Sequence, residues 1–148
     1  MLQNSQNKTM NIFQKYQNSA YSIYEAIAKT GQFSNSYLFA GPASSQKEDI
    51  ALYFASLILG KSDLKHPDLH IFEHGGSKEY TIDQIRDLIS DIELAPIAGQ
   101  NKVYIIKDAE KLKISCSNAF LKTWEEPPLN ACIILICNNE DSVLPTIL

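Results

Sequence analysis

The sequence predicts a three-layer α/β domain built on a mostly parallel central sheet. Apolar segments of strand length alternate along the chain with longer segments of helical periodicity. Two of the strand-like segments, Val103–Ile106 and Cys132–Cys137, are apolar throughout, as expected of strands buried on both faces of a parallel sheet. A helical segment separates them, which makes a right-handed strand–helix–strand unit. Alternation of this kind is typical of domains with helices on both faces of a sheet.

The predicted elements run from an N-terminal helical region to a final strand. Residues 1–10 are polar and rich in Asn and Gln, so we expect them to be disordered and residues 11–148 to form the domain. Helical spacing between Asn11 and Lys29 predicts one or two helices that end at Gly31. The remaining strands and helices are expected in the order Ser36–Ala40, Lys47–Leu59, Leu69–Phe72, Thr81–Ile92, Val103–Ile106, Ser115–Glu126 and Cys132–Cys137.

The helix ends and apolar faces also follow from the sequence. Thr81 is a typical N-cap residue. Pro127 and Pro128 end the last helix, because proline has no N–H and pushes the preceding residue out of the helical region. The expected core-facing residues are Ile50, Phe54, Leu57 and Ile58 in the first of these helices, Ile82, Ile85, Leu88, Ile89 and Ile92 in the second, and Ala119, Phe120 and Trp124 in the third.

Composition excludes several classes of protein. The 148 residues, 45% of them hydrophobic, suit one globular domain with a sizeable core. No apolar run is long enough to cross a membrane, and the N-terminus lacks the apolar core of a signal peptide. The net charge of −4 gives no general attraction to DNA. Three cysteines without a CxxC pair indicate reduced thiols, so we expect a cytoplasmic protein.

The loop after the first strand has the frame of a P-loop without its chemistry. A working P-loop is G-x-x-x-x-G-K-[ST], in which backbone N–H groups and the Lys hold phosphates and the hydroxyl binds Mg²⁺. Gly41 and Lys47 are retained, but Gln46 replaces a glycine and Glu48 replaces the hydroxyl residue. A carboxylate about 4 Å from a phosphate charge costs roughly 1–4 kcal/mol. Productive ATP binding is therefore not expected here.

Two other interpretations of this loop remain open. Ser45-x-x-Glu48 is also a capping-box pattern, so the loop could be no more than a well-capped helix entrance. Alternatively, Lys47 could hold a phosphate or nucleotide weakly. We favour the capped entrance.

The strand Val103–Ile106 is followed by Lys107 and Asp108, where an active ATPase has Asp-Glu to hold Mg²⁺ and orient the attacking water. If Asp108 is instead aligned with the aspartate that holds Mg²⁺, Ala109 occupies the position of the catalytic carboxylate. We expect Glu48 and Lys107 to form an ion pair in place of Mg²⁺, with Lys47 and Asp108 nearby. A separation well beyond about 6 Å would contradict it.

Ligands of parallel sheets bind at the carboxyl ends of the strands, so the loops of interest are 41–48, 107–114 and 138–145. Asn138 follows the strand Cys132–Cys137 at this edge, where it could sense the γ-phosphate of a nucleotide or simply satisfy backbone groups. The i, i+4, i+8 spacing of the histidines suggests metal ligands only on a helix, and Pro67 opposes a helix. These histidines are His66, His70 and His74. The sequence therefore predicts no metal site, and it offers no catalytic triad.

Three blocks carry a resemblance to a known family: KVYII from Lys102, NAFLKTWEEPP from Asn118 and LPTIL from Leu144. The second block is the specific one. The chain resembles, from about Asn35 onward, the clamp-loader subunits of bacterial DNA polymerase III in the AAA+ superfamily. In that family a glycine occupies the position of Ser44.

The resemblance, with the altered P-loop, implies a non-hydrolysing subunit of the delta-prime type without a cofactor. Such a subunit joins gamma/tau and delta subunits in a five-membered ring that places the sliding clamp on primed DNA. It also implies lid and collar domains, and an arginine-bearing Ser-Arg-Cys motif, beyond Leu148. The alternatives are an active gamma/tau-type ATPase and a AAA+ adaptor unrelated to replication.

Overall fold

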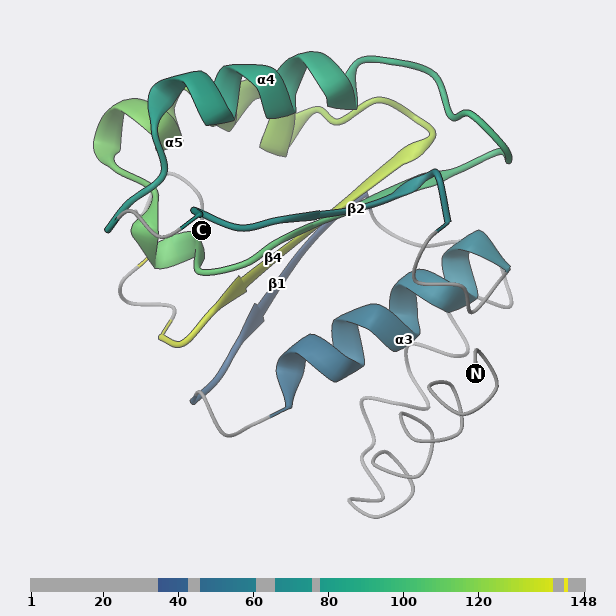
Figure 1. Cartoon of the computed structure of the whole chain (residues 1–148), viewed down its shortest axis with the longest axis horizontal. Helices are drawn as coiled ribbons and strands as arrows, with labels where there is room; N and C mark the ends of the chain where they lie inside the picture. Colours follow the sequence, from purple (N-terminus) through teal and green to yellow (C-terminus); the bar gives the residue numbers. More distant parts are fainter. Residues whose placement is uncertain (1–34, 43–45, 61–65, 76–77, 140–142, 144–148) are drawn as a thin grey trace.

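The computed structural model describes residues 35–42, 46–60, 66–75, 78–139 and 143, which form a three-layer α/β domain (Figure 1). The helices and strands predicted over this part of the chain are all present, with ends that shift by at most one residue. They are β1 (Ser36–Ala40), α3 (Lys47–Leu59), β2 (Leu69–Phe72), α4 (Ile82–Ile92), β3 (Lys102–Ile106), the short 3₁₀ helix η1 (Ala109–Lys111), α5 (Ile114–Glu125) and β4 (Ala131–Cys137). The expectations for residues 1–34 and for the segment after Leu144 lie outside the described residues.

The four described strands form one parallel sheet in the order β1-β4-β3-β2. The register pairs Phe72 of β2 with Ile106 of β3, and Ala40 of β1 with Cys137 of β4. Because the strands are parallel, their carboxyl ends lie along one edge of the sheet. The loops that follow the strands therefore meet at that edge.

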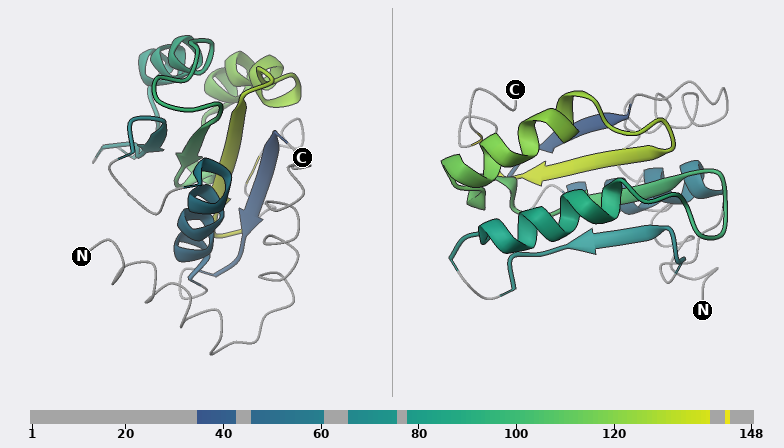
Figure 2. Two further views of the ribbon diagram at one scale, coloured as in Figure 1. Left: turned by 90° about the vertical axis from the view of Figure 1, so that its right-hand side faces the viewer. Right: turned by 90° about the horizontal axis from the view of Figure 1, so that it is seen from above.

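The helices cover both faces of the sheet. α3 lies on one face, and α4 and α5 lie side by side on the other (Figures 1 and 2). The chain crosses from β1 over α3 to β2 at the opposite edge, and then returns through β3 to β4. Since such crossovers share one hand, reversing the direction of travel moves the connecting helices to the opposite face.

Each face of the sheet has its own apolar core, and the two inner strands contribute to both. Every residue of β3 and β4 is buried, as the sequence predicted for Val103–Ile106 and Cys132–Cys137. Burial also raises the pKa of the Cys132 thiol to about 12. Phe54 and Ile134 belong to the core under α3, whereas Phe120 and Ile133 belong to the core under α4 and α5.

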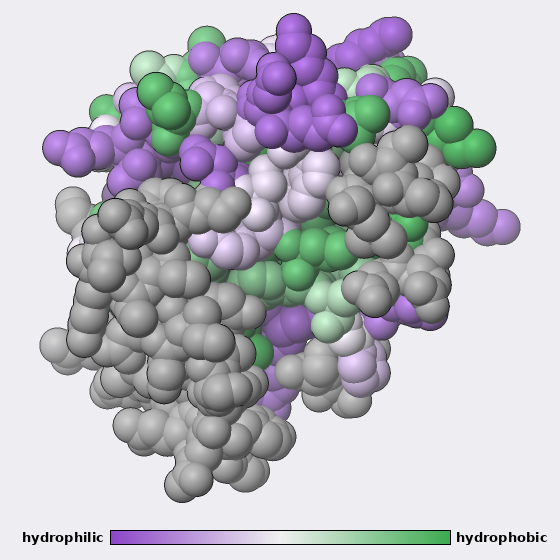
Figure 3. Space-filling model, turned by 180° about the vertical axis from the view of Figure 1, so that it is seen from behind, coloured by the Kyte–Doolittle hydropathy of each residue, from purple (hydrophilic) through white to green (hydrophobic). Residues whose placement is uncertain are grey.

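The outer surface of the helix layer is polar. Seen from behind, hydrophilic side chains predominate along the top of the molecule, with some hydrophobic ones among them, and hydrophobic side chains gather near the middle of this face (Figure 3). The prediction that Ala119 faces the core is wrong: it is exposed, and the buried stripe of α5 is Cys116, Ser117, Phe120 and Thr123. Ala119 lies off the i, i+4, i+7 stripe of Cys116, Phe120 and Thr123 that meets the core.

The start of α4 confirms its predicted cap. The Thr81 hydroxyl accepts a hydrogen bond from the Gln84 N–H, and the Gln84 side chain accepts one from the Thr81 N–H, which completes a capping box. The capping box predicted for Ser45 and Glu48 is wrong. The N-cap of α3 is Gln46, which has a left-handed backbone (φ 59°). Glu48 is thus one position too early in α3 for the box, and its carboxylate pairs with a lysine instead.

Two buried charged residues hold the entry to β3. Asp68 is 1% exposed, and its carboxylate accepts hydrogen bonds from the N–H groups of Ile97, Ala98 and Gly99 at 2.6, 2.8 and 3.1 Å. Lys102 is 3% exposed, and its ammonium donates to the carbonyl of Asp91 at the end of α4, 2.6 Å away. The 95–101 loop is therefore held in its middle by Asp68, and Lys102, directly after the loop, is tied to the end of α4.

Candidate functional site

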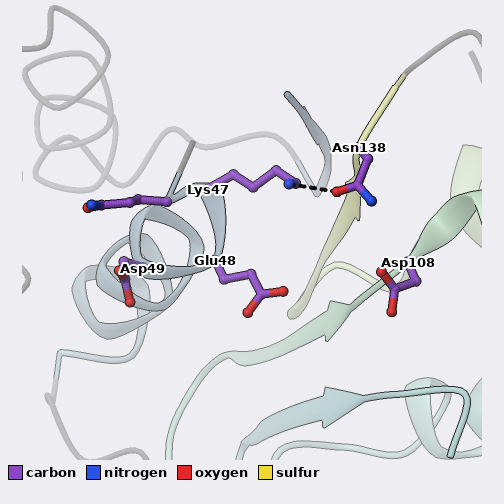
Figure 4. Close-up of a pocket in the computed structure, with 6 residues that line it drawn as sticks. Lys47, Glu48, Asp49, Asp108 and Asn138 are labelled. Carbon is purple, nitrogen blue, oxygen red and sulfur yellow. Dashed lines mark hydrogen bonds between the residues drawn. The ribbon is translucent and has the colours of Figure 1, made fainter. Parts of the chain in front are cut away.

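A polar pocket of about 290 Å³ opens at the carboxyl edge of the sheet (Figure 4). The start of α3, the turn after β3 and the end of β4 supply its walls. All of the described lining residues are polar or charged, and five of them belong to the predicted site. The lining residues are Gln46, Lys47, Glu48, Asp49, Asp108 and Asn138.

Lys47 crosses the pocket from α3 to β4. Its ammonium donates to the Asn138 side-chain oxygen at 3.0 Å and to the Pro42 carbonyl at 3.2 Å (Figure 4). The residue is only 9% exposed. Asn138 in turn donates its backbone N–H to Glu110 at 3.3 Å. The positive charge retained from the P-loop frame is thus held inward by neutral oxygens of the protein.

Lys107 lies beside this pair and contacts two carboxylates. Its ammonium is 3.5 Å from Glu48 Oε2 on α3 and 3.0 Å from Glu73 Oε1 after β2. The predicted Glu48–Lys107 ion pair is therefore confirmed. Partial burial acts to lower the pKa of Lys107, but the hydrogen bond to Glu73 and the charges of Glu48 and Glu73 outweigh it and raise the pKa above its ordinary value. The hydrogen bond and charge of Lys107 lower the pKa of Glu73. Both partners stay charged near neutral pH.

Asp108 turns away from Lys107 to a histidine. Its backbone is left-handed (φ 53°), and its carboxylate lies 3.2 Å from His74 Nε2. Aspartate adopts this conformation more readily than most residues do. Although Asp108 and Glu48 face the same pocket in Figure 4, they are not bonded to a common partner in the described structure. Asp108 is therefore nearby, as expected, but in a separate pair.

The other predicted residues have smaller roles. The Gly41 N–H donates to the Cys137 carbonyl at 3.2 Å, which extends the pairing of β1 with β4. The Gln46 side-chain oxygen is buried and has no hydrogen-bond partner among the described residues. Ser44 and Ser45 lie outside the part of the chain that the structure describes.

Sequence reasoning missed Glu73 and His74. Both come directly after β2, in a loop that was not among those singled out. The signal was available, because a polar residue that follows an apolar strand lies at the ligand-binding edge of a parallel sheet. However, only the strand order shows that β2 neighbours β3, with Phe72 beside Ile106 and hence Glu73 beside Lys107.

The three histidines have separate environments. His66 Nδ1 accepts a hydrogen bond from the Asp68 N–H at 3.0 Å, and His70 stacks on the Tyr104 ring with centroids 4.8 Å apart. Only His74 reaches the pocket region.

Among the described residues, no group of three His, Cys, Asp or Glu side chains is arranged to hold a metal ion. In the same residues, no helix is long and apolar enough to span a membrane.

A P-loop site implies Mg²⁺, and the residues present do not fit it. Mg²⁺ requires oxygen ligands at about 2.0–2.1 Å in octahedral geometry. Where a hydroxyl and an aspartate would face each other across the ion, Glu48 and Lys107 face each other directly, 3.5 Å apart. The ammonium group of Lys107 therefore takes up the space that the ion would need.

Comparisons with known protein families and relatives indicate the family to which the chain belongs. Residues 16–148 match the family described as DNA polymerase III, delta subunit. The chain belongs to this family of clamp-loader subunits. It is 26% identical to the delta-prime subunit of Pseudomonas aeruginosa, over 85% of this chain and 44% of that protein. It is 31% identical to the tau subunit of Bacillus subtilis, over 82% of this chain and 25% of that protein.

Solved structures agree with the family assignment. A gamma subunit-related protein of DNA polymerase III from Thermotoga maritima superimposes with a TM-score of 0.72 at 27% identity, covering 84% of this chain and 42% of that one. The RuvB branch migration motor of the same organism gives a TM-score of 0.59 at 13% identity, over 84% of this chain and 38% of that one, which shows the fold alone. The fold is thus the AAA+ fold. The chain spans less than half the length of the relatives that it matches.

Proposed function

We propose that this clamp-loader family member is of the delta-prime type. In this proposal it takes part in DNA replication in the cytoplasm, within a ring that contains gamma/tau and delta subunits. The ring loads the sliding clamp onto primed DNA, and this chain neither binds nor hydrolyses ATP productively. Its pocket is a retired nucleotide site, and its contribution is structural.

One observation carries the proposal: the Lys107 ammonium lies 3.5 Å from Glu48 at the place where an active site would hold Mg²⁺. Triphosphate binding at a P-loop depends on that ion to offset the phosphate charge. Lys47 adds support, because its ammonium is already bonded to Asn138 and Pro42 rather than directed into open space. ATP would have to break these contacts before it could bind.

The second candidate is an active gamma/tau-type ATPase. It is favoured by the 31% identity to a tau subunit and by the presence of Lys47, the phosphate-binding residue of the P-loop frame. Against it stand Glu48, whose negative charge would repel the phosphates, and Lys107, whose positive charge would repel Mg²⁺. The two candidates differ in one measurable property, which is Mg²⁺-dependent ATP binding.

Titration calorimetry with ATP, with and without Mg²⁺, separates the candidates. We expect no binding tighter than about 1 mM for the natural chain. The Gln46→Gly/Glu48→Thr/Lys107→Asp variant should recover some Mg²⁺-dependent binding. A matched control is Glu79→Thr/Lys113→Asp, which alters another Lys–Glu pair (3.2 Å) outside the pocket and should bind nothing. Micromolar Mg²⁺-dependent binding by the natural chain would contradict the proposal and favour the ATPase.

A further inference from the structure

Lys107 lies where three elements meet. Glu48 comes from α3, Glu73 follows β2, and Lys107 follows β3, yet both carboxylates contact the one ammonium group. Two negative charges are therefore gathered around a single positive charge. Asp108 lines the same pocket as Glu48 (Figure 4), although its carboxylate pairs with His74. Without Lys107, this edge would hold a cluster of carboxylate oxygens with no cation between them.

We infer that the Lys107 ammonium is a resident cation that keeps divalent metal ions away from the carboxylates of Glu48 and Glu73. This inference rests on the proposed function, since it states how the retired site came to dispense with Mg²⁺. A metal ion at these oxygens would occupy the space of the ammonium and would be repelled by its charge. The metal ion is therefore excluded by the charge of Lys107, and not by a lack of carboxylate ligands.

Glu73 is the positioning residue for this cation. At 3.0 Å it is closer to the ammonium than Glu48, and its hydrogen bond contributes to the raised pKa of Lys107. The pairing of Phe72 with Ile106 places Glu73 and Lys107 side by side as the strands end. The Tyr80 hydroxyl lies within hydrogen-bonding distance of the carbonyls of Phe72 and Lys107, which fixes the same two strand ends.

Asp108 does not compete for the ammonium. Its left-handed backbone directs its carboxylate to His74, so Lys107 remains with Glu48 and Glu73. The arrangement has a testable consequence. If the charge of Lys107 is removed, carboxylate oxygens remain at the edge of the pocket, and such hard oxygen ligands are those that Mg²⁺ and Mn²⁺ prefer.

The test measures Mn²⁺ binding by electron paramagnetic resonance, with no nucleotide present. We expect no specific binding by the natural chain and binding at least about tenfold tighter by Lys107→Met, which keeps the aliphatic stem. Lys113→Met removes the lysine of a pair with a single carboxylate, Glu79, and should behave like the natural chain. Adding Glu73→Gln to Lys107→Met should weaken the new site again.

Two results would overturn the inference: Mn²⁺ binding by the natural chain as tight as by Lys107→Met, or a folded Lys107→Met variant that binds no better than the natural chain. Should Lys107→Met fail to fold, NMR titration of the lysine side chains in the Glu73→Gln variant decides instead. The pKa of Lys107 must then fall relative to the natural chain, and an unchanged pKa would equally overturn the inference. Because ATP is absent throughout, these outcomes are independent of the calorimetric test of the proposed function.

Discussion

Asp68 balances its buried negative charge with backbone dipoles. Its carboxylate accepts three N–H groups from the 97–99 segment and is 1% exposed. Burial alone would raise the pKa of Asp68, but these hydrogen bonds, together with the nearby His66, hold the pKa below its ordinary value. Lys47 and Lys107 carry the opposite charge and are held in a comparable way, because oxygens of neighbouring elements contact each ammonium.

Replacing Asp68 by Asn should lower the free energy of unfolding by about 2–3 kcal/mol at pH 7, because hydrogen bonds to a charged acceptor are lost in a buried place. The pKa of Asp68 is lower in the folded state than in the unfolded state. Its stabilisation is therefore complete above the unfolded pKa, near 3.8, and is lost as the pH falls through the lower folded pKa. Urea denaturation at a series of pH values measures both effects.

Asp83→Asn is the matched control for Asp68. Asp83 is 89% exposed and lies 4.0 Å from Arg86, so its replacement should change stability by no more than about 0.5 kcal/mol. The stability of Asp68→Asn should also depend less on acid than that of the natural chain. Equal acid sensitivity in the two proteins would rule out a charged Asp68 as the anchor of the 97–99 segment.

At the scale of elements, the two helices whose starts were predicted to be capped begin differently. α4 begins with a complete capping box, whereas α3 begins at a left-handed Gln46 that offers no side-chain cap in the described structure. The first turn of α3 carries Glu48 and Asp49, which suit the positive end of the helix dipole. Glu48 also pairs with Lys107, so the start of α3 is held by contacts to the pocket rather than by its own cap.

Thr81→Ala should lower the free energy of unfolding by about 1 kcal/mol, because the N–H of Gln84 loses its acceptor. Urea denaturation at pH 7 measures the change. Ser115→Ala serves as the comparison, since Ser115 is exposed in the first turn of α5 and is not its N-cap. That variant should stay within about 0.5 kcal/mol of the natural chain. A loss of similar size in both variants would mean that the capping box is not the cause.

At the scale of the whole molecule, the central strands join the two cores. Ile133 and Ile134 are neighbours on β4, yet they contribute to opposite cores. Both residues are fully buried. Neither core can open without disturbing a strand that the other core needs. We therefore expect the described domain to unfold in one cooperative transition.

Ile134→Val tests this cooperativity. The change removes one methylene group from the core under α3 and should cost about 0.5–1.5 kcal/mol. Trp124 packs against the opposite core, so its fluorescence reports on the far face. In urea, the fluorescence and circular dichroism midpoints should shift together. Leu129→Ala, at a position 92% exposed, should leave both midpoints almost unchanged. Separate midpoints in Ile134→Val would mean that the two faces unfold independently.

The sequence by itself determined the strands, the helices and the charges at the P-loop positions. Periodicity and apolar runs report local preferences and one-sided burial, and residue types at motif positions report charge. It also gave the Glu48–Lys107 pair, because the motif already implies that those positions face each other. The start of α3 was predicted correctly, but its N-cap was not, since a left-handed Gln46 leaves no pattern in the sequence.

Only the tertiary structure decided which strands are neighbours, and hence which side chains share a partner. The order β1-β4-β3-β2 places Glu73 beside Lys107 and brings His74 to Asp108, although 34 residues of chain separate each pair. It likewise brings the N–H groups of Ile97, Ala98 and Gly99 to Asp68. Such contacts depend on the crossover of the whole chain around the sheet. Local spacing, which is all that a single sequence displays, does not encode them.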